Sequence, residues 1–336
     1  MAVESQAYAR AGLVGNPSDG YFGKTISIIV RNFSAKVTLF ESDRVEIVPS
    51  FEDRPEFDSV RQLVSEVRLN GYYGGDRLMK AALSRFVEYC DTEGHDLHDR
   101  NFSLRYRSTI PRRVGLAGSS ALITATLRCL MDFYEVDIPQ PVLASLIWGV
   151  EKEELGISAG LQDRVIQVYE GAVFMDFDQA YMEEHGYGRY TRIDPDSIPN
   201  IYIAYRTSLA EGSEVFHNNI RERWLQGDPE VVQAMKDFAD YAQQVYDLVS
   251  SGRGTEIGPI LDQNFDRRRS IFKLSQGDIE MLERARSVGA SAKFAGSGGA
   301  IVGTYADAGM YESLEEVFTD TDTVLLKPVI QEGVSV

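Results

Sequence analysis

The sequence Pro111-Arg-Arg-Val-Gly-Leu-Ala-Gly-Ser-Ser-Ala-Leu-Ile-Thr-Ala125 lies between a strand-like segment, residues 102–110, and a long apolar helical pattern. Gly115 and Gly118 let the backbone approach a ligand closely and let consecutive N–H groups point in one direction. The N-terminus of the following helix carries a partial positive charge, which favours a bound phosphate. The serines after Gly118 add hydroxyl groups that can bond a phosphate oxygen or bind Mg²⁺. We therefore predict an anion site; the alternative is a Gly-Ser linker whose serine caps a helix.

Length and composition predict a globular protein with two domains. A chain of 336 residues is longer than one ordinary compact domain. Its 43% hydrophobic and 25% charged residues are typical of a globular chain. The net charge of −17 argues against nucleic acid and against an anionic membrane as partners. An acidic protein that binds phosphate must gather cations locally, and the candidate clusters are Arg112-Arg113 and Arg267-Arg268-Arg269.

Cysteine usage and hydropathy indicate a cytoplasmic protein. Cys90 and Cys129 fall in helical patterns and form no motif, which favours a reducing compartment. The 4 histidines show no metal-ligand spacing, so a zinc site is not expected. The N-terminus lacks the basic and then apolar run of a secretory signal. No apolar run approaches the ~18–20 residues of a membrane span.

Hydrophobic periodicity predicts an α+β fold, with an N-terminal domain at 1–188 and a C-terminal domain at 189–336. The polar, glycine-containing stretch 181–188 is the expected junction. Strands are expected at 8–16, 25–40, 44–49, 102–110, 171–176, 189–193, 200–206, 290–294, 300–305 and 323–327. Helices are expected at about 57–69, 76–93, 118–134, 140–155, 161–169, 213–225, 229–251, 254–273, 277–288 and 310–318.

Acidic residues at two turns each allow two interpretations. Asp19, in Asn16-Pro-Ser-Asp-Gly-Tyr21, can accept hydrogen bonds from sugar hydroxyls, but these residues are also typical of an ordinary turn. In Glu151-Lys-Glu-Glu-Leu-Gly-Ile-Ser-Ala-Gly-Leu-Gln-Asp163, the final aspartate either complements a helix dipole or joins a second acid at a Mg²⁺ site. Gly160 would then allow a substrate to approach Asp163.

Two further motifs of the sequence are rich in glycine. Gly20-Tyr-Phe-Gly-Lys-Thr25 is not a P-loop, because Ser18 stands where that motif needs its first glycine and a strand pattern follows. Lys293-Phe-Ala-Gly-Ser-Gly-Gly-Ala300 joins two apolar strands, either as a tight hairpin or as a second phosphate-facing loop.

Four motifs together resemble the GHMP small-molecule kinases, which include galactokinase, homoserine kinase and mevalonate kinase. They are Gly15-Asn-Pro-Ser-Asp19, the Pro-x-x-x-Gly-Leu-x-Gly-Ser-Ser-Ala pattern at 111–121, Gly160-Leu-Gln-Asp163 and Lys293-x-x-Gly-Ser-Gly-Gly299. Further stretches resemble the plant-type glucuronokinases of this family: Asn70-Gly-Tyr-Tyr-Gly-Gly75, Glu151-Lys-Glu-Glu-Leu-Gly-Ile157, Ala159-Gly-Leu-Gln-Asp-Arg164 and Asn264-Phe-Asp-Arg-Arg-Arg269.

The resemblance implies a two-domain GHMP kinase fold: a ribosomal-S5-domain-2-like N-terminal domain and a ferredoxin-like C-terminal domain, with the active site between them. Asp163 matches the aspartate near the acceptor hydroxyl, and Arg10 matches the cation that would lower the pKa of Asp163 or of the hydroxyl. Ser120 and Glu151 match the Mg²⁺ ligands, with Glu153 as the alternative because Glu151 lies one residue farther from the aspartate than in mevalonate kinase. ATP would lie along Pro111, Gly115, Leu116, Ala117, Gly118, Ser119, Ser120 and Ala121.

The implied reaction is the ATP-dependent phosphorylation of the anomeric hydroxyl of D-glucuronate. Asp19 matches the sugar-binding aspartate of galactokinase, whereas Asn16 replaces a glutamate there, which disfavours galactose. Alternatives are another sugar, such as galactose, arabinose, galacturonate or a heptose, and a non-catalytic sugar sensor. An arginine is the natural partner of the uronate carboxylate. Candidate substrate-binding residues are Asn16, Asp19, Asp163, Arg164, Arg268, Arg269, Gly296, Ser297, Gly298 and Gly299.

Overall fold

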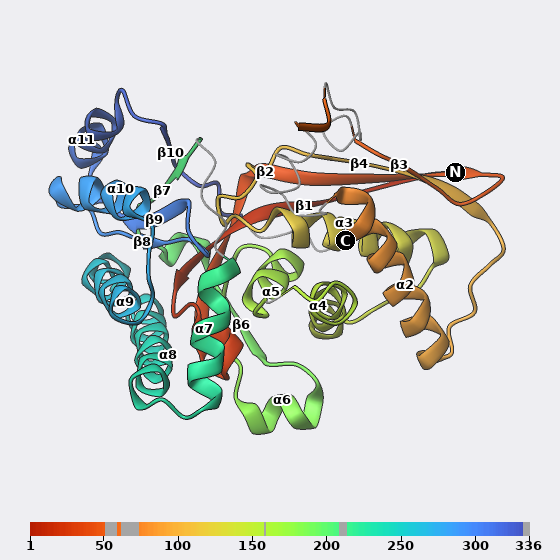
Figure 1. Cartoon of the computed structure of the whole chain (residues 1–336), viewed down its shortest axis with the longest axis horizontal. Coiled ribbons are helices and arrows are strands. Elements are labelled where there is room, and N and C mark those ends of the chain that lie inside the picture. Colours follow the sequence, from red (N-terminus) through yellow and green to blue (C-terminus); the bar gives the residue numbers. More distant parts are fainter. Residues whose placement is uncertain (51–58, 62–73, 158, 208–213, 332–336) are drawn as a thin grey trace.

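The computed structural model describes residues 1–50, 59–61, 74–157, 159–207 and 214–331, and within them two β-sheets with packed helices (Figure 1). The larger sheet contains β1 (Ala2–Val14), β2 (Lys24–Ser42), β3 (Glu46–Val48), β4 (Asn101–Ser108), β5 (Ala172–Asp176) and β6 (Arg189–Ile193). The smaller sheet contains β7 (Ile201–Arg206), β8 (Lys293–Phe294), β9 (Ala300–Thr304) and β10 (Thr323–Leu326). The predicted α+β class is confirmed.

Strand β2 organises the larger sheet. Along one edge it pairs antiparallel with β1, from Ala2 opposite Phe40 to Val14 opposite Ile26. Its other edge is shared, because β4 pairs with one half of β2 and β5 with the other half. Its side chains at 26, 28, 30, 37 and 39 are fully buried, as expected of a central strand whose apolar residues face the helices.

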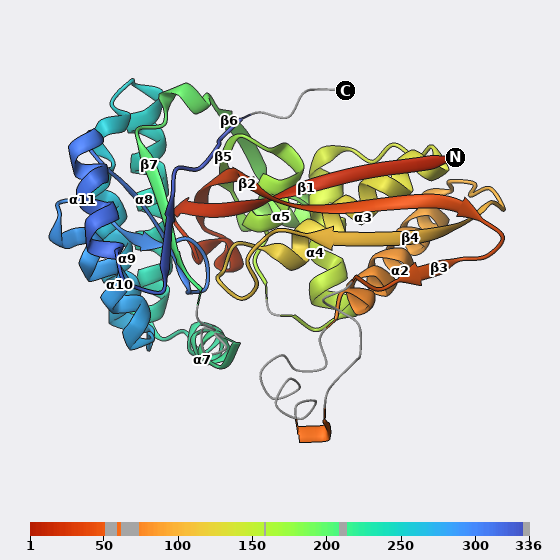
Figure 2. The same ribbon diagram turned by 90° about the horizontal axis from the view of Figure 1, so that it is seen from above.

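Four helices lie on one side of this sheet (Figures 1 and 2), and α4 packs on the other helices of this layer. They are α2 (Gly75–Glu93), α3 (Gly118–Tyr134), α4 (Gln140–Gly149) and α5 (Gln162–Tyr169). The helix expected at 118–134 is confirmed to the residue, whereas the one expected at 140–155 ends at Gly149 and continues as a π-helical turn, Val150–Glu154. The helix expected at 57–69 lies outside the described residues except at 59–61, where residues 60 and 61 are helical.

The C-terminal half packs its helices against the smaller sheet and against the larger one. Its helices are α7 (Glu214–Leu225), α8 (Pro229–Ser250), α9 (Gly258–Ile271), α10 (Gln276–Ser287) and α11 (Ala308–Phe318). Helix α8 contacts β2, and its buried Ala242 and Val245 belong to the same apolar core as Ile26 and Ile28. The two halves therefore share one continuous core, which holds the functional groups of both in place.

The segment expected to join the domains is ordered. Strand β6 pairs with β5, so the larger sheet extends to Ile193 and the chain changes sheets before Ile201. The expected boundary at 188 therefore falls between two paired strands. The polar stretch 181–188 overlaps helix α6 (Gln179–His185), because Asp178 caps the helix by accepting a hydrogen bond from the Tyr181 amide.

Candidate active site

The Gly-Ser stretch forms the expected strand, loop and helix. The loop leaves β4 and enters α3 at Gly118, after three residues in the left-handed region: Arg113 and Ala117, each with φ 62°, and Gly115 with φ 69°. Alanine rarely adopts this conformation, and such outliers concentrate at ligand-binding loops. The buried Ser120 hydroxyl donates to the Ala117 carbonyl at 3.2 Å. The loop therefore has the strained backbone and the helix N-terminus that a phosphate-binding role requires.

The second glycine loop, residues 295–299, lies directly against the first. A Cβ atom at Gly115 would lie 2.7 Å from the Gly298 carbonyl oxygen, and one at Gly299 would lie 2.9 Å from the Val114 Cα. A Cβ atom at Gly296 would overlap the Gly115 carbonyl oxygen. Only glycine allows the two backbones to come this close, so these glycines serve the contact between the two loops.

Arg10 joins both loops to the candidate catalytic aspartate. Its Nε and Nη2 atoms donate to Asp163 Oδ1 and Oδ2 at 2.6 and 2.7 Å, a bidentate pair between β1 and α5. Its Nη1 atom donates to the Gly115 carbonyl at 2.5 Å and to the Ala295 carbonyl at 3.2 Å. Burial raises the pKa of Asp163, but the charges of Arg10 and Arg164 outweigh it and leave this pKa below its ordinary value. Asp163 is therefore ionised at neutral pH.

Glu151 forms a second buried pair, with Arg164. The π-helical turn places Glu151 inside the protein, where its Oε2 atom contacts Arg164 Nη2. Burial raises the pKa of Glu151, although the Arg164 charge opposes this rise. Its Oε1 atom has no hydrogen-bond partner among the described residues. Arg164 also donates to the Gly160 carbonyl at 2.7 Å and lies 3.4 Å from Asp163, so it links the two carboxylates.

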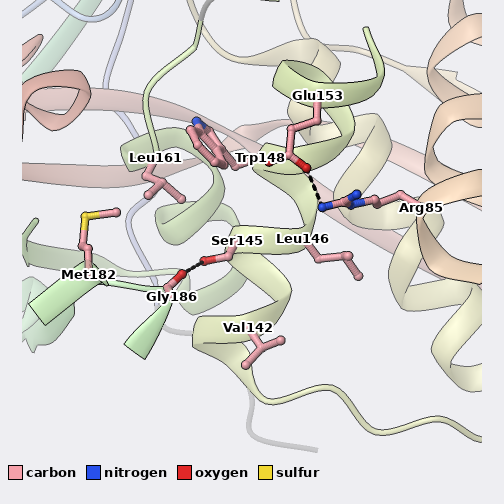
Figure 3. A pocket seen from close by; sticks show the side chains of 9 residues that line it. All are labelled: Arg85, Val142, Ser145, Leu146, Trp148, Glu153, Leu161, Met182 and Gly186. Carbon is pink, nitrogen blue, oxygen red and sulfur yellow. Dashed lines mark hydrogen bonds and ion pairs between the residues drawn. The ribbon is translucent and has the colours of Figure 1, made fainter. Parts of the chain in front are cut away.

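Glu153 lies apart from this group. Its carboxylate is 2.5 Å from Arg85 Nη2 and is half-exposed, at the wall of a surface cavity of about 300 Å³ (Figure 3). None of the residues that line this cavity is Arg10, Asp19 or Asp163. Of the two glutamates considered from the sequence, Glu151 is thus the one that joins the buried charges.

Asp19 is a third carboxylate of the candidate site, and its position explains why residue 160 is a glycine. Asp19 accepts hydrogen bonds from the backbone N and the Nε2 atom of Gln162, each at 3.2 Å. A Cβ atom at Gly160 would overlap Asp19 Oδ2, so this glycine makes room for Asp19. Burial, with the nearby charge of Asp163, raises the pKa of Asp19 to about 7.

Arg268 and Arg269, which are adjacent in α9, differ in burial. Arg268 is buried and donates to the Gly296 carbonyl at 2.9 Å and to the Ser297 carbonyl at 3.4 Å, so it supports the second glycine loop. Burial lowers the pKa of Arg268 to about 10. Arg269 is half-exposed and pairs with Glu283 at 3.1 Å. The structure thus joins Arg268 to the other candidates and separates Arg269 from them, because adjacent residues of a helix face different sides.

Three further residues belong to the group. Gln162 holds Asp19 and accepts a hydrogen bond from Ser27 at 3.0 Å. Lys293 donates to the Asn16 side chain at 2.6 Å, and Tyr21 lies close enough to Asp19 and Arg268 for their charges to affect its pKa. Gln162 and Lys293 stood inside quoted motifs but carried no role there, and no pattern in the sequence identified Tyr21.

The described residues fit a magnesium ion that is bound together with phosphates. They contain no group of three or more histidine, cysteine, aspartate or glutamate residues arranged as a metal cage. Mg²⁺ usually takes one or two carboxylates and fills its other positions with phosphate oxygens and water. The free Oε1 atom of Glu151 and the hydroxyl of Ser120 are oxygen ligands of the right chemistry for Mg²⁺.

Among the described residues, no helix is long and apolar enough to cross a membrane.

Comparisons with known proteins agree with this geometry. Residues 77–171 match the model of the GHMP kinases N terminal domain. The chain is 44% identical to Probable glucuronokinase 2 of Arabidopsis thaliana, over 89% of this chain and 83% of that protein. It is 42% identical to Glucuronokinase 1 of the same plant, over 90% of this chain and 84% of that protein.

A solved structure shows the same fold at much lower identity. The structure of Lactococcus lactis galactokinase complexed with galactose superimposes with a TM-score of 0.76 at 14% sequence identity. The match covers 99% of this chain and 94% of the galactokinase chain. The shared fold, the matched N-terminal model and the two plant relatives lead to one conclusion: the chain belongs to the GHMP kinase family.

Proposed function

We propose that this protein transfers the γ-phosphoryl group of ATP to the anomeric hydroxyl of D-glucuronate. The observation that carries the proposal is the bidentate Arg10–Asp163 pair beside the two glycine loops. The 42–44% identity to plant glucuronokinases supports the choice of sugar. Asn16 stands where the galactokinase motif has a glutamate, and it presents no negative charge to a uronate.

Asp163 would act on the sugar hydroxyl. Each carboxylate oxygen has two lone pairs, so Asp163 can accept a hydrogen bond from the sugar while Arg10 occupies the other positions. Because its pKa lies below the ordinary value, Asp163 is ionised, so it can orient the hydroxyl and accept its proton while the γ-phosphoryl group passes from ADP to the sugar oxygen. Asp19 and Gln162 would hold the other hydroxyl groups of the ring.

The loop at 111–121 and the N-terminus of α3 would hold the phosphates of ATP, with the second glycine loop on the opposite side. Ser120 and Glu151 would hold Mg²⁺, which neutralises the phosphate charge when it is bound. We also propose a cytoplasmic location, where the free thiols of Cys90 and Cys129 persist.

A coupled assay of ADP release tests the proposal across glucuronate, galacturonate, galactose, arabinose and mevalonate. We expect the highest kcat/KM with glucuronate, and coupling between phosphorus and the anomeric proton in the ³¹P NMR spectrum of the product. Turnover of a neutral sugar without turnover of a uronate would refute the choice of substrate. ATP binding without turnover of any compound would favour a sugar sensor.

A further inference from the structure

Lys293 is a buried cation that contacts only neutral groups. It begins β8 and is 1% exposed. Its Nζ atom lies 2.6 Å from the Gly12 carbonyl oxygen, 2.6 Å from Asn16 Oδ1 and 2.7 Å from the Phe294 carbonyl oxygen. Three acceptors around one nitrogen need three N–H donors, and only the ammonium form of lysine has three. This geometry fits the ammonium form of Lys293, and no ion pair to Lys293 lies within the residues that the structure describes.

This ammonium group lies in a corner that already holds buried cations. Burial and the charges of Arg268 and Arg10 lower the pKa of Lys293, which shows how strongly this corner disfavours another positive charge. Arg268 is itself buried, and its Nε atom has no partner among the described residues. Buried charges are stable only when opposite charges or hydrogen bonds balance them. An anionic group on the substrate would supply that balance.

The hydrogen bond from Lys293 also sets the orientation of Asn16. The Oδ1 atom of Asn16 accepts from Nζ, so the Nδ2 atom, which only donates, faces the other way. Nδ2 has no partner among the described residues, although Asn16 is only 2% exposed. Gly12 places this amide beside the sugar-binding groups, because a Cβ atom there would lie 3.0 Å from Gln162 Oε1 and 3.2 Å from Asn16 Cγ.

We propose that Lys293 is a positioning residue that turns Asn16 Nδ2 toward the carboxylate of a uronic acid. Lys293 and Arg268 together provide the positive potential that favours an acid over the corresponding neutral sugar. This inference rests on the proposed function and extends it, since it assigns the selection of a uronate to a buried hydrogen-bonded corner. The selection depends on an amide and a lysine and needs no arginine contact with the substrate.

The substitution Asn16→Asp tests the inference with little risk to folding. The aspartate still accepts the hydrogen bond from Lys293 and neutralises its charge, but it loses the N–H donor and repels a carboxylate. Hydrogen bonds to charged groups are worth enough to change affinity by about 10- to 100-fold. We expect the KM for glucuronate to rise by this factor, while kcat changes less and the KM for ATP is unchanged. With D-glucose, the neutral counterpart, kcat/KM should not fall.

Asn200→Asp is the matched control, because it adds the same charge at an exposed position that contacts the Ala306 carbonyl. Lys293→Met removes the ammonium and frees the Asn16 amide to turn, so it should lower the preference for glucuronate over glucose as well. Lys273→Met, at an exposed lysine, is its control. Melting temperatures measured without ligand identify variants that do not fold, and Asn16→Asp still tests the inference if Lys293→Met fails.

Calorimetric binding of glucuronate and glucose separates this inference from the proposed function. If the wild-type protein does not phosphorylate glucuronate, the proposed function fails. Preferential binding of the acid, and loss of this preference in Asn16→Asp, would still support the role of Lys293 and Asn16 in selecting the acid. Equal effects of Asn16→Asp on the acid and on the neutral sugar would overturn the inference, as would no effect on either. Equal binding of both sugars by the wild-type protein would overturn it too.

Discussion

Replacing Asp163 with asparagine separates the catalytic role of this residue from its structural role. The change keeps the shape of the side chain but turns one acceptor oxygen into an NH₂ group that faces an N–H donor of Arg10. Arg10 is 5% exposed, so its charge then lacks its main partner in the interior. Breaking a buried ion pair in this way costs about 3–5 kcal/mol of stability. Losing a positioned acceptor for the hydroxyl proton should lower turnover by ~10²–10⁴-fold.

The double variant Asp163→Asn with Arg10→Met distinguishes the two losses. Methionine fills much of the volume of the arginine stem, and removing both charges is often close to neutral for stability. We therefore expect the free energy of unfolding, measured in urea, to recover in part, although Arg10 also bonds the Gly115 and Ala295 carbonyls. Turnover should not recover, because no group remains to accept the hydroxyl proton.

Single-turnover kinetics at saturating ATP and sugar measure the phosphoryl-transfer step directly in each variant. ATP binding, followed by calorimetry, should survive in Asp163→Asn, because Asp163 has no hydrogen bond or ion pair with the loop at 111–121 in the described structure. The double variant also loses the bond from Arg10 to the Gly115 carbonyl of that loop, so its ATP affinity should fall relative to that of the single variant. A double variant that regains a tenth of wild-type turnover would show that Asp163 only neutralises Arg10. A single variant with turnover within threefold of the wild type would refute the assignment outright.

Four other substitutions test the charges and the close contacts of the site. Because the pKa of Asp19 is raised from 3.8 to about 7, the folded state binds a proton more tightly there, so stability should fall as the pH rises across this window. Asp19→Asn should flatten this fall in urea titrations at pH 5 and pH 8, and an unchanged slope would contradict the raised pKa. Gly160→Ala would force Asp19 away, so it should lower the free energy of unfolding by about 1–3 kcal/mol. Calorimetry should show weaker sugar binding while ATP still binds. Equal weakening of both ligands would point to a general collapse. Arg268→Ala should lower the free energy of unfolding, measured by thermal unfolding, by about 2–4 kcal/mol, because two loop carbonyls lose their donor. Arg269→Ala should lower it by less than about 1 kcal/mol, because this arginine is half-exposed. Equal losses of stability would contradict the difference in burial.

Local patterns in the sequence predicted most elements of the fold. Helix α3 and strand β6 have the expected bounds because their apolar periodicity and their flanking glycine and polar residues act within a few residues. The chain changes sheets after Ile193, beyond the polar stretch 181–188, because the pairing of β6 with β5 depends on neighbours that a local pattern does not contain. Strand β1 is longer than expected for the same reason: its first residues are largely polar, yet they pair with the far end of β2.

The chemistry of the site could be read from residue types and motif order. The residue types of the Gly-Ser loop predicted an anion site directly, whereas the roles of Asp163, Arg10 and the second glycine loop came from the resemblance of their motifs to the GHMP kinases. The sequence alone therefore determined the family, the kind of reaction and the segments that carry it.

Only the tertiary structure decided which side chains meet. It placed Glu151 inside and Glu153 outside, through a π-helical turn that no local pattern announced. It joined Lys293 to Asn16 across 277 residues of chain, and it turned Arg268 inward while leaving Arg269 half-exposed. Contacts of this kind depend on how two sheets and their helices share one core. Burial and the partners of each charge are properties of that packing, and they are absent from the order of residues along the chain.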